Sequence, residues 1–292
     1  MKANFWKPQS IPHPNPSPLG RGLNNWLAKP LPNGEGLGWG AILCFLCVSL
    51  CLTLFSCSTE QKPSTSDPTY TLIFIDKTRS VNVNRAFVMR KYQQAINDII
   101  EQNIRQKGDR LDVYFIHENT SKARALNMTV RAEMEDVSAA SPTDREAAET
   151  EFDLLLTREK AQIRQRVLQQ LVAQNDGASN QRTDIWASLP VIEKASETGL
   201  SVKVYYLSDM IESVPGANRR DFQKTPPRDN TQADEWAKAD AQNLKRYTIG
   251  SPEITMLLPF APNASVRENN PAVTQYWQTL FAELGVGNVM EE

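Results

Sequence analysis

Two apolar runs in this sequence each end at an aspartate, and two spaced hydroxyl side chains follow the first one. Tyr70–Ile75 leads into Asp76, Thr78 and Ser80 occupy alternate positions after it, and a later apolar run ends at Asp209. Because open α/β sheets place their ligands at the carboxyl edge of the strands, we expect the two carboxylates to be neighbours there. The alternate spacing can turn three oxygen-bearing side chains toward one point. A hard divalent cation prefers such ligands and keeps room for an acidic group from outside.

Four apolar runs predict the strands that position these side chains, and the segments between them predict helices. The strands are expected at Tyr70–Ile75, Arg110–Glu118, Ser201–Asp209 and Glu253–Pro259. The helices are expected at about 88–104, 143–174, 184–199, 232–247 and 271–284, and the charged segment 122–135 is a candidate edge strand. Strands that alternate with helices predict an α/β fold, with a Rossmann-like, open, mostly parallel sheet, flanking helices and right-handed crossovers.

The second of these helices is long and polar, and we interpret about residues 136–180 as a helical insertion packed on the sheet. Thr143 and Glu146 have the spacing of a capping box at its start. One apolar stripe follows along the helix, formed by Phe152, Leu155, Ile163, Val167 and Leu171. A stripe of this kind predicts that one face of the helix is buried.

Residues 1–57 differ from the rest of the chain and have the composition of a leader. They hold four basic residues, one acidic residue and seven of the eighteen prolines. The uncharged run Ala41–Phe55 has the length of a signal-peptide h-region and is short for a membrane span. An uncleaved anchor helix that reaches about Ser58 is the alternative interpretation. Both interpretations place the remaining domain outside the cytoplasm.

The end of the leader, Leu54-Phe55-Ser56-Cys57, resembles the lipobox of bacterial lipoproteins. The resemblance implies that Cys57 is lipidated and anchors the protein to a membrane of the bacterial cell envelope. Residues 58–69 are polar and rich in Ser, Thr and Pro, as expected of a tether, and residues 70–292 remain for the folded domain.

The residue inventory of the exported part excludes several classes of function. After residue 57 there are 28 of the 32 basic and 33 of the 34 acidic residues, which gives a net charge of −5. This balance disfavours a nucleic-acid partner. All four cysteines lie in the leader and only His117 remains as a histidine, so catalytic triads and His-rich zinc sites are disfavoured.

The chemistry-bearing residues resemble the metal-ion-dependent adhesion site of the von Willebrand factor type A family. The family pattern is Asp-x-Ser-x-Ser, a distant Thr and a distant Asp, and Asp76-Lys77-Thr78-Arg79-Ser80 matches its first part with a Thr for a Ser. The segment "RTDIWASL" resembles the threonine loop and assigns Thr183, and "VYYLSDM" assigns Asp209. Met210 stands where the family usually has Gly.

This resemblance, which spans about residues 70–284, implies both the fold and a way of binding. It implies a Rossmann-like sheet whose carboxyl edge binds Mg²⁺ or Mn²⁺ through residues 76, 78, 80, 183 and 209. It also implies a non-catalytic domain whose partner protein supplies an Asp or Glu as the last ligand of the ion. The loop 212–230, with four basic residues beside this edge, is the expected specificity element or else a solvated flap.

Two alternatives use the same residues differently. "FIDKT" also resembles haloacid-dehalogenase-like phosphotransferases, in which Asp76 would be the nucleophile. Such enzymes need a strand ending in Ser or Thr, for which only Thr120 is available, and paired acids, for which Asp209 and Glu212 are the candidates. The second alternative is an interaction scaffold with a degenerate metal site, in which hydroxyls such as that of Thr183 only cap helices.

Overall fold

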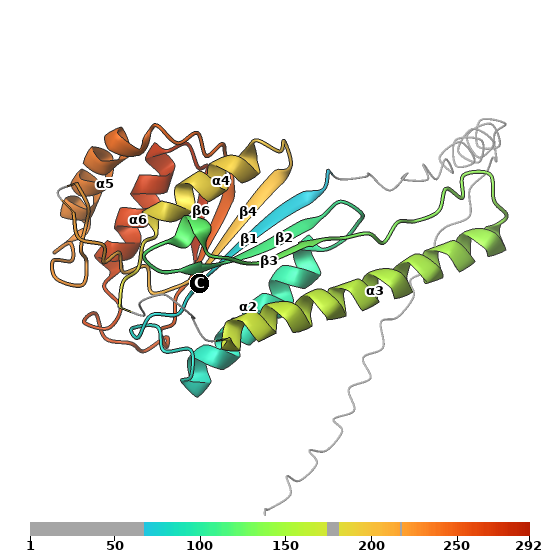
Figure 1. Cartoon of the computed structure of the whole chain (residues 1–292), viewed down its shortest axis with the longest axis horizontal. Coiled ribbons are helices and arrows are strands. Elements are labelled where there is room, and N and C mark those ends of the chain that lie inside the picture. The colour runs from blue at the N-terminus through green and yellow to red at the C-terminus, as the bar shows by residue number, and fades with distance from the viewer. Residues whose placement is uncertain (1–66, 174–180, 217) are drawn as a thin grey trace, which may run out of the picture. The chain divides into compact units, whose positions relative to one another are not determined.

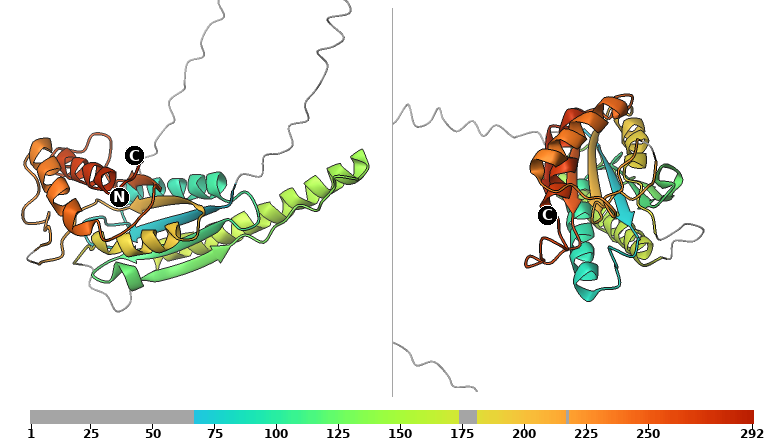
Figure 2. Two further views of the ribbon diagram at one scale, coloured as in Figure 1. Left: turned by 90° about the horizontal axis from the view of Figure 1, so that it is seen from above. Right: turned by 90° about the vertical axis from the view of Figure 1, so that its left-hand side faces the viewer.

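Six strands form one sheet in the order β3-β2-β1-β4-β5-β6, with helices on both faces (Figures 1 and 2). The computed structural model describes residues 67–173, 181–216 and 218–292, which all belong to a compact unit that spans Thr65–Glu292. The predicted leader, Cys57 and most of the predicted tether lie outside the described residues. Among the described helices, none is long and apolar enough to cross a membrane.

All neighbouring strands are parallel except for one antiparallel pair at an edge of the sheet. The strands are β1 (Thr69–Asp76), β2 (Arg110–Ile116), β3 (Arg124–Thr129), β4 (Ser201–Leu207), β5 (Glu253–Leu257) and β6 (Asn288–Glu291). The antiparallel pair is β2–β3, which confirms the candidate edge strand. The mostly parallel α/β fold is therefore as predicted, and β6 is an additional short edge strand that the sequence analysis missed.

In the part of the chain that the structure describes, five α-helices cover the two faces of the sheet. They are α2 (Ala86–Asn103), α3 (Pro142–Val172), α4 (Leu189–Ser196), α5 (Asn230–Leu244) and α6 (Pro271–Glu283). Helices α2 and α3 enclose one hydrophobic cluster against the sheet, and α4, α5 and α6 enclose the other. This two-sided burial explains the almost continuous apolar run of β1. Leu72 and Phe74 point into one cluster, and Ile73 and Ile75 point into the other.

Helix α3 differs from its prediction at its start and in its buried face. Ser141 is the N-cap, since its Oγ accepts a hydrogen bond from the Asp144 N–H and Pro142 follows it, so the capping box predicted at Thr143 and Glu146 is wrong. Leu155 is 40% exposed, because Phe152 and Leu156, rather than Leu155, lie on the face of the helix that packs against the hydrophobic cluster. The buried positions are Ile163, Val167 and Leu171.

Candidate metal centre

The two aspartates that end apolar strands lie at one edge of the sheet. Strand β1 ends at Asp76, and its neighbour β4 ends two residues before Asp209, with Ile75 paired to Leu207. The parallel pairing therefore brings both carboxyl ends to the same edge. Asp76 is fully buried and Asp209 is 5% exposed.

Each carboxylate is oriented by hydrogen bonds from its own or the adjacent loop. Asp76 Oδ1 accepts from the Thr78 N–H at 2.8 Å, and its Oδ2 accepts from Ser208 Oγ at 2.7 Å. Asp209 Oδ1 accepts from the Ile211 N–H at 3.1 Å. The Asp76 carboxylate thus ties the loop after β1 to the loop after β4.

Burial and mutual repulsion make it costly for the two acids to be ionised together. Burial, reinforced by the charge of Asp209, raises the pKa of Asp76 to about 7. Burial also raises the pKa of Asp209, which hydrogen bonds from the Ser80 hydroxyl and the Ile211 N–H partly offset. Within residues 67–173, 181–216 and 218–292, neither carboxylate forms an ion pair with a basic side chain. A negatively charged pair of this kind needs an added cation or a shared proton.

The adjacent lysine does not supply that cation. Lys77 Nζ donates to the main-chain carbonyls of Gln170 and Ala173 at the end of α3, and it lies 4.4 Å from the ring centroid of Phe115. Burial lowers the pKa of Lys77 to about 8. Its side chain is therefore committed to anchoring α3.

Three predicted hydroxyl ligands surround a single cavity beside the carboxylates. Thr78 Oγ1 and Ser80 Oγ are 3.0 Å apart, and both residues line a cavity of about 310 Å³ together with Thr183. Ser80 also lines a second cavity with Asp209, which joins the hydroxyl cluster to the acid pair. The structure thus brings all five predicted residues, 76, 78, 80, 183 and 209, to one edge of the sheet.

Thr183 is held in place by main-chain contacts rather than used as a helix cap. Its N–H donates to Ser213 Oγ at 2.8 Å, and its carbonyl accepts from the Ser213 N–H at 3.0 Å. Asp184 makes the capping contact, accepting from the Ala187 N–H at 2.9 Å in the 3-10 turn Trp186–Ser188 that precedes α4. The capping role considered for Thr183 is therefore wrong.

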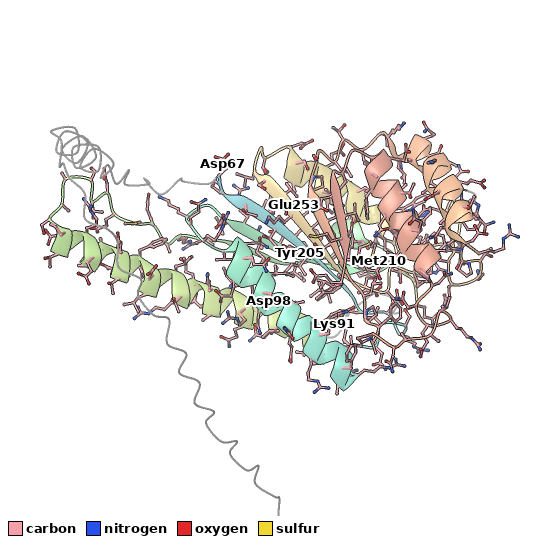
Figure 3. The ribbon with its side chains drawn as sticks, turned by 180° about the vertical axis from the view of Figure 1, so that it is seen from behind. Asp67, Lys91, Asp98, Tyr205, Met210 and Glu253 are labelled. Atoms are coloured by element: carbon pink, nitrogen blue, oxygen red, sulfur yellow. The ribbon has the colours of Figure 1, made fainter. Side chains whose placement is uncertain are left out.

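The turn after Asp209 has the conformation that a glycine would favour, although Met210 occupies it. Met210 has φ of +60°, a region that costs an L-residue about 1 kcal/mol or more. Its N–H donates to Ser208 Oγ at 3.0 Å, and its carbonyl accepts from Trp277 Nε1 at 2.8 Å. The side chain is fully buried near the end of β4 (Figure 3), so packing and hydrogen bonds offset the strained backbone.

An ion-pair network behind this edge was not foreseen from the sequence. Arg219 donates to Asp184 and to Glu212, at 2.5 Å each, and its guanidinium lies 4.7 Å from the ring centroid of Trp186. Glu212 is fully buried and also accepts from the Ile185 N–H. Burial raises the pKa of Glu212 to about 7, although the Arg219 charge opposes that rise. The network fastens the first part of the loop 212–230 to the threonine loop, so this part is not a solvated flap.

Tyr92 is a further residue near the acid pair that sequence reasoning did not identify. It is fully buried on α2, and its hydroxyl has no hydrogen-bond partner within the described residues. Burial, with added contributions from the charges of Asp76 and Asp209, raises the pKa of this phenol. Tyr92 lies in the helix expected at about 88–104, at the spacing of its buried face, so no sequence signal marked its closeness to the carboxylates.

These residues fit a hard divalent cation. Two carboxylates and three hydroxyls provide only oxygen donors, which Mg²⁺ and Mn²⁺ accept, and the buried negative charge has no other counterion in the described part of the chain. No group of three or more His, Cys, Asp or Glu residues suited to a metal occurs among the described residues. A site here therefore depends on the hydroxyls as well as on the acids.

Comparisons with known proteins gave similarities of structure only. No protein-family model and no curated protein matches the chain. Similar solved structures include proximal thread matrix protein 1 from the mussel byssus, with 12% identity, a TM-score of 0.35 and coverage of 78% of this chain and 44% of that chain. The PilB minor pilin from Streptococcus sanguinis is 10% identical, with a TM-score of 0.38 and coverage of 79% and 58%.

A von Willebrand factor type A structure from Catenulispora acidiphila is also similar. It is 12% identical, with a TM-score of 0.32 and coverage of 75% of this chain and 42% of that chain. The chain thus spans less than two thirds of the length of each of these three proteins. Since a fold does not define a function, the function is argued from the site itself.

Proposed function

We propose that residues 70–292 form a non-catalytic binding domain of the von Willebrand factor type A kind, which recognises a partner protein through a divalent cation. Mg²⁺ or Mn²⁺ would be held at the carboxyl edge by Asp76, Thr78, Ser80, Thr183 and Asp209. When bound, the ion supplies positive charge that accepts an Asp or Glu carboxylate of the partner. A lipid on Cys57 would tether the domain to a membrane of the bacterial cell envelope, outside the cytoplasm.

The buried acid pair is the observation that carries this proposal. Asp76 and Asp209 are almost completely enclosed, and burial raises the pKa of both carboxyls. Among the described residues no basic side chain neutralises them, while the hydroxyls of Thr78 and Ser80 lie beside them. A divalent cation provides the missing charge and takes the oxygen donors that are present.

Three contacts count against the alternative, a phosphotransferase with Asp76 as nucleophile. Thr120, the candidate hydroxyl of the neighbouring strand, donates its Oγ1 proton to main-chain carbonyls. Lys77 is bound to the end of α3, and Glu212 is paired with an arginine. The parts that would bind phosphate are thus engaged elsewhere, and we expect no phosphatase turnover that Asp76→Asn abolishes.

Thermal unfolding of residues 65–292 in Mg²⁺ and Mn²⁺ titrations tests the metal site. This fragment contains both hydrophobic clusters and is expected to fold alone. Linkage predicts a gain in the free energy of unfolding of about 2.7 kcal/mol at a hundredfold excess over the dissociation constant, reversed by EDTA. Asp209→Ala should abolish the gain.

A matched control removes a buried carboxylate elsewhere. Asp112→Asn alters a fully buried acid in the middle of β2, away from the carboxyl edge, and should keep the metal-dependent gain. If wild type shows no gain in either metal, the site is degenerate and the scaffold alternative replaces this proposal. If Asp209→Ala gains as much as wild type, the ion binds somewhere other than this edge.

A further inference from the structure

A groove lies between α4 and the strands β2 and β3, on the side of α4 that faces away from α5 and α6. It has a volume of about 660 Å³, and most of the residues that line it come from α4, β2 and β3. Its lining includes two tyrosines and four basic residues: Tyr70, Tyr114, Arg110, Lys122, Arg124 and Lys194. This feature is called the α4–β3 groove below.

The floor of the groove is a part of the sheet face formed by Tyr70 of β1 and by side chains of β2 and β3. In the register of β1 and β2, Leu72 pairs with Asp112 and Phe74 pairs with Tyr114. The β1 residues of this face lie in the hydrophobic cluster beneath α4, whereas Asp112 of β2 accepts from the Tyr70 hydroxyl at 3.1 Å. On this face of β2, Tyr114 and Ile116 still belong to the hydrophobic cluster, so hydrogen-bonding side chains replace apolar ones only in the amino-terminal half of β2 and on β3.

The groove is basic in a domain that is acidic overall. None of the residues that line it is acidic, whereas residues 58–292 carry a net charge of −5. Arg124 lies 3.7 Å from the buried Asp112 carboxylate and is partly neutralised by it. Arg110, Lys122 and Lys194 are exposed and form no ion pair with an acid of the described chain. Their combined field attracts an anionic ligand.

The position of the groove indicates where that anion comes from. Tyr70 and Arg110 pair with each other at the starts of β1 and β2, and Lys194 lies in the last turn of α4, so one end of the groove lies where the chain enters the domain. Cys57 is thirteen residues before Tyr70, a distance that extended chain spans in at most about 45 Å. A lipid on that cysteine would keep a membrane within reach of this end.

We propose that the α4–β3 groove binds the headgroups of anionic phospholipids in the membrane that holds the tether. The proposal rests on the tethering part of the proposed function, but it is independent of the metal. The groove extends from Tyr70 and Arg110, at the amino edge of the sheet, to Lys122, which follows the carboxyl end of β2.

Co-sedimentation of residues 65–292 with lipid vesicles, in EDTA, tests this proposal without a lipid anchor or a metal. The fragment should bind vesicles that contain 30% phosphatidylglycerol, should not bind pure phosphatidylcholine vesicles, and should dissociate in high salt. Each basic residue near an anionic surface contributes about fivefold. Lys122→Glu/Lys194→Glu should therefore weaken binding at least about twentyfold while the protein stays folded by circular dichroism.

The matched control reverses two exposed charges on another surface of the same domain. Arg228→Glu/Lys238→Glu changes the net charge equally and should bind as wild type does. If both double variants lose vesicle binding equally, net charge alone explains the binding and the proposal is overturned. If the fragment does not bind anionic vesicles, the proposal is overturned and the groove has no lipid ligand. If the groove binds soluble polyglutamate instead of vesicles, the proposal is overturned in favour of an acidic protein segment. Each of these outcomes leaves the metal titration unaffected.

Discussion

The buried acid pair predicts an unusual pH dependence of stability in the metal-free protein. Burial and the charge of Asp209 raise the folded-state pKa of Asp76 from 3.8 to about 7. The folded protein then binds more protons than the unfolded chain between these two values. Stability contributed by Asp76 is therefore fully present at low pH and is lost as the pH rises from about 4 through about 7.

The magnitude follows from the two pKa values. A displacement of about three pH units corresponds to about 4 kcal/mol in total, of which roughly 2 to 3 kcal/mol falls between pH 5 and pH 8. Asp76→Asn removes the ionisation while its side-chain carbonyl can still accept the Thr78 N–H. Between pH 5 and pH 8, we therefore expect the free energy of unfolding of wild type to fall by roughly 2 to 3 kcal/mol more than that of Asp76→Asn.

Urea unfolding at several pH values in EDTA measures this difference. Comparison with wild type cancels the titrating groups that do not interact with Asp76, including Glu212, whose pKa burial raises to about 7. Asp98→Asn removes an exposed carboxylate from α2 (Figure 3) and should follow wild type. Mn²⁺ added at pH 8 should restore the stability of wild type but not that of Asp76→Asn. Parallel pH curves for wild type and Asp76→Asn would refute the claim that ionisation of Asp76 is costly.

Three further substitutions test individual contacts. Arg219→Ala leaves Glu212 buried without its partner and should lower the free energy of unfolding by about 3 kcal/mol in urea at pH 8. The control Arg228→Ala, at an exposed position, should change it by almost nothing. Equal losses would mean that the ion-pair network does not stabilise the fold. Tyr92→Phe removes a buried hydroxyl that has no partner among the described residues. It should change the free energy of unfolding of the metal-free protein by less than about 1 kcal/mol. A larger loss would mean that this hydroxyl forms a hydrogen bond. Thr183→Val keeps the shape of the side chain but removes its hydroxyl, and calorimetry should show Mn²⁺ affinity weakened about tenfold or more. Unchanged affinity would mean that Thr183 is not part of the site.

The sequence was most informative where one strong physical rule acted alone. Continuous apolar runs predicted the central strands, and the aspartates that end β1 and β4 were placed at one edge by the parallel arrangement. Strand β6 was missed because Asn288–Glu291 is short and only slightly buried, so it carries little apolar signal. The start of α3 was misplaced because Ser141-Pro142 and the predicted capping box lie only two residues apart, and both suit a helix start.

Tertiary contacts decided the features that the sequence left open. Glu212 and Arg219 lie in a loop with an ordinary surface composition, and only folding places them against Asp184 beneath the threonine loop. Met210 departs from the glycine of the family pattern, yet the Trp277 indole and the surrounding core hold it in the left-handed conformation. Neither contact has a local sequence signature, because each joins residues from different elements.

The most direct test of the central claim is to locate the ion itself. Crystals of residues 65–292 grown with Mn²⁺ should show an anomalous scattering peak at the carboxyl edge of the sheet, among the oxygens of Asp76, Thr78, Ser80, Thr183 and Asp209. Asp209→Ala crystals grown in the same way should lack that peak. A wild-type map with no peak at this edge, or with manganese bound only at another surface, would contradict the account.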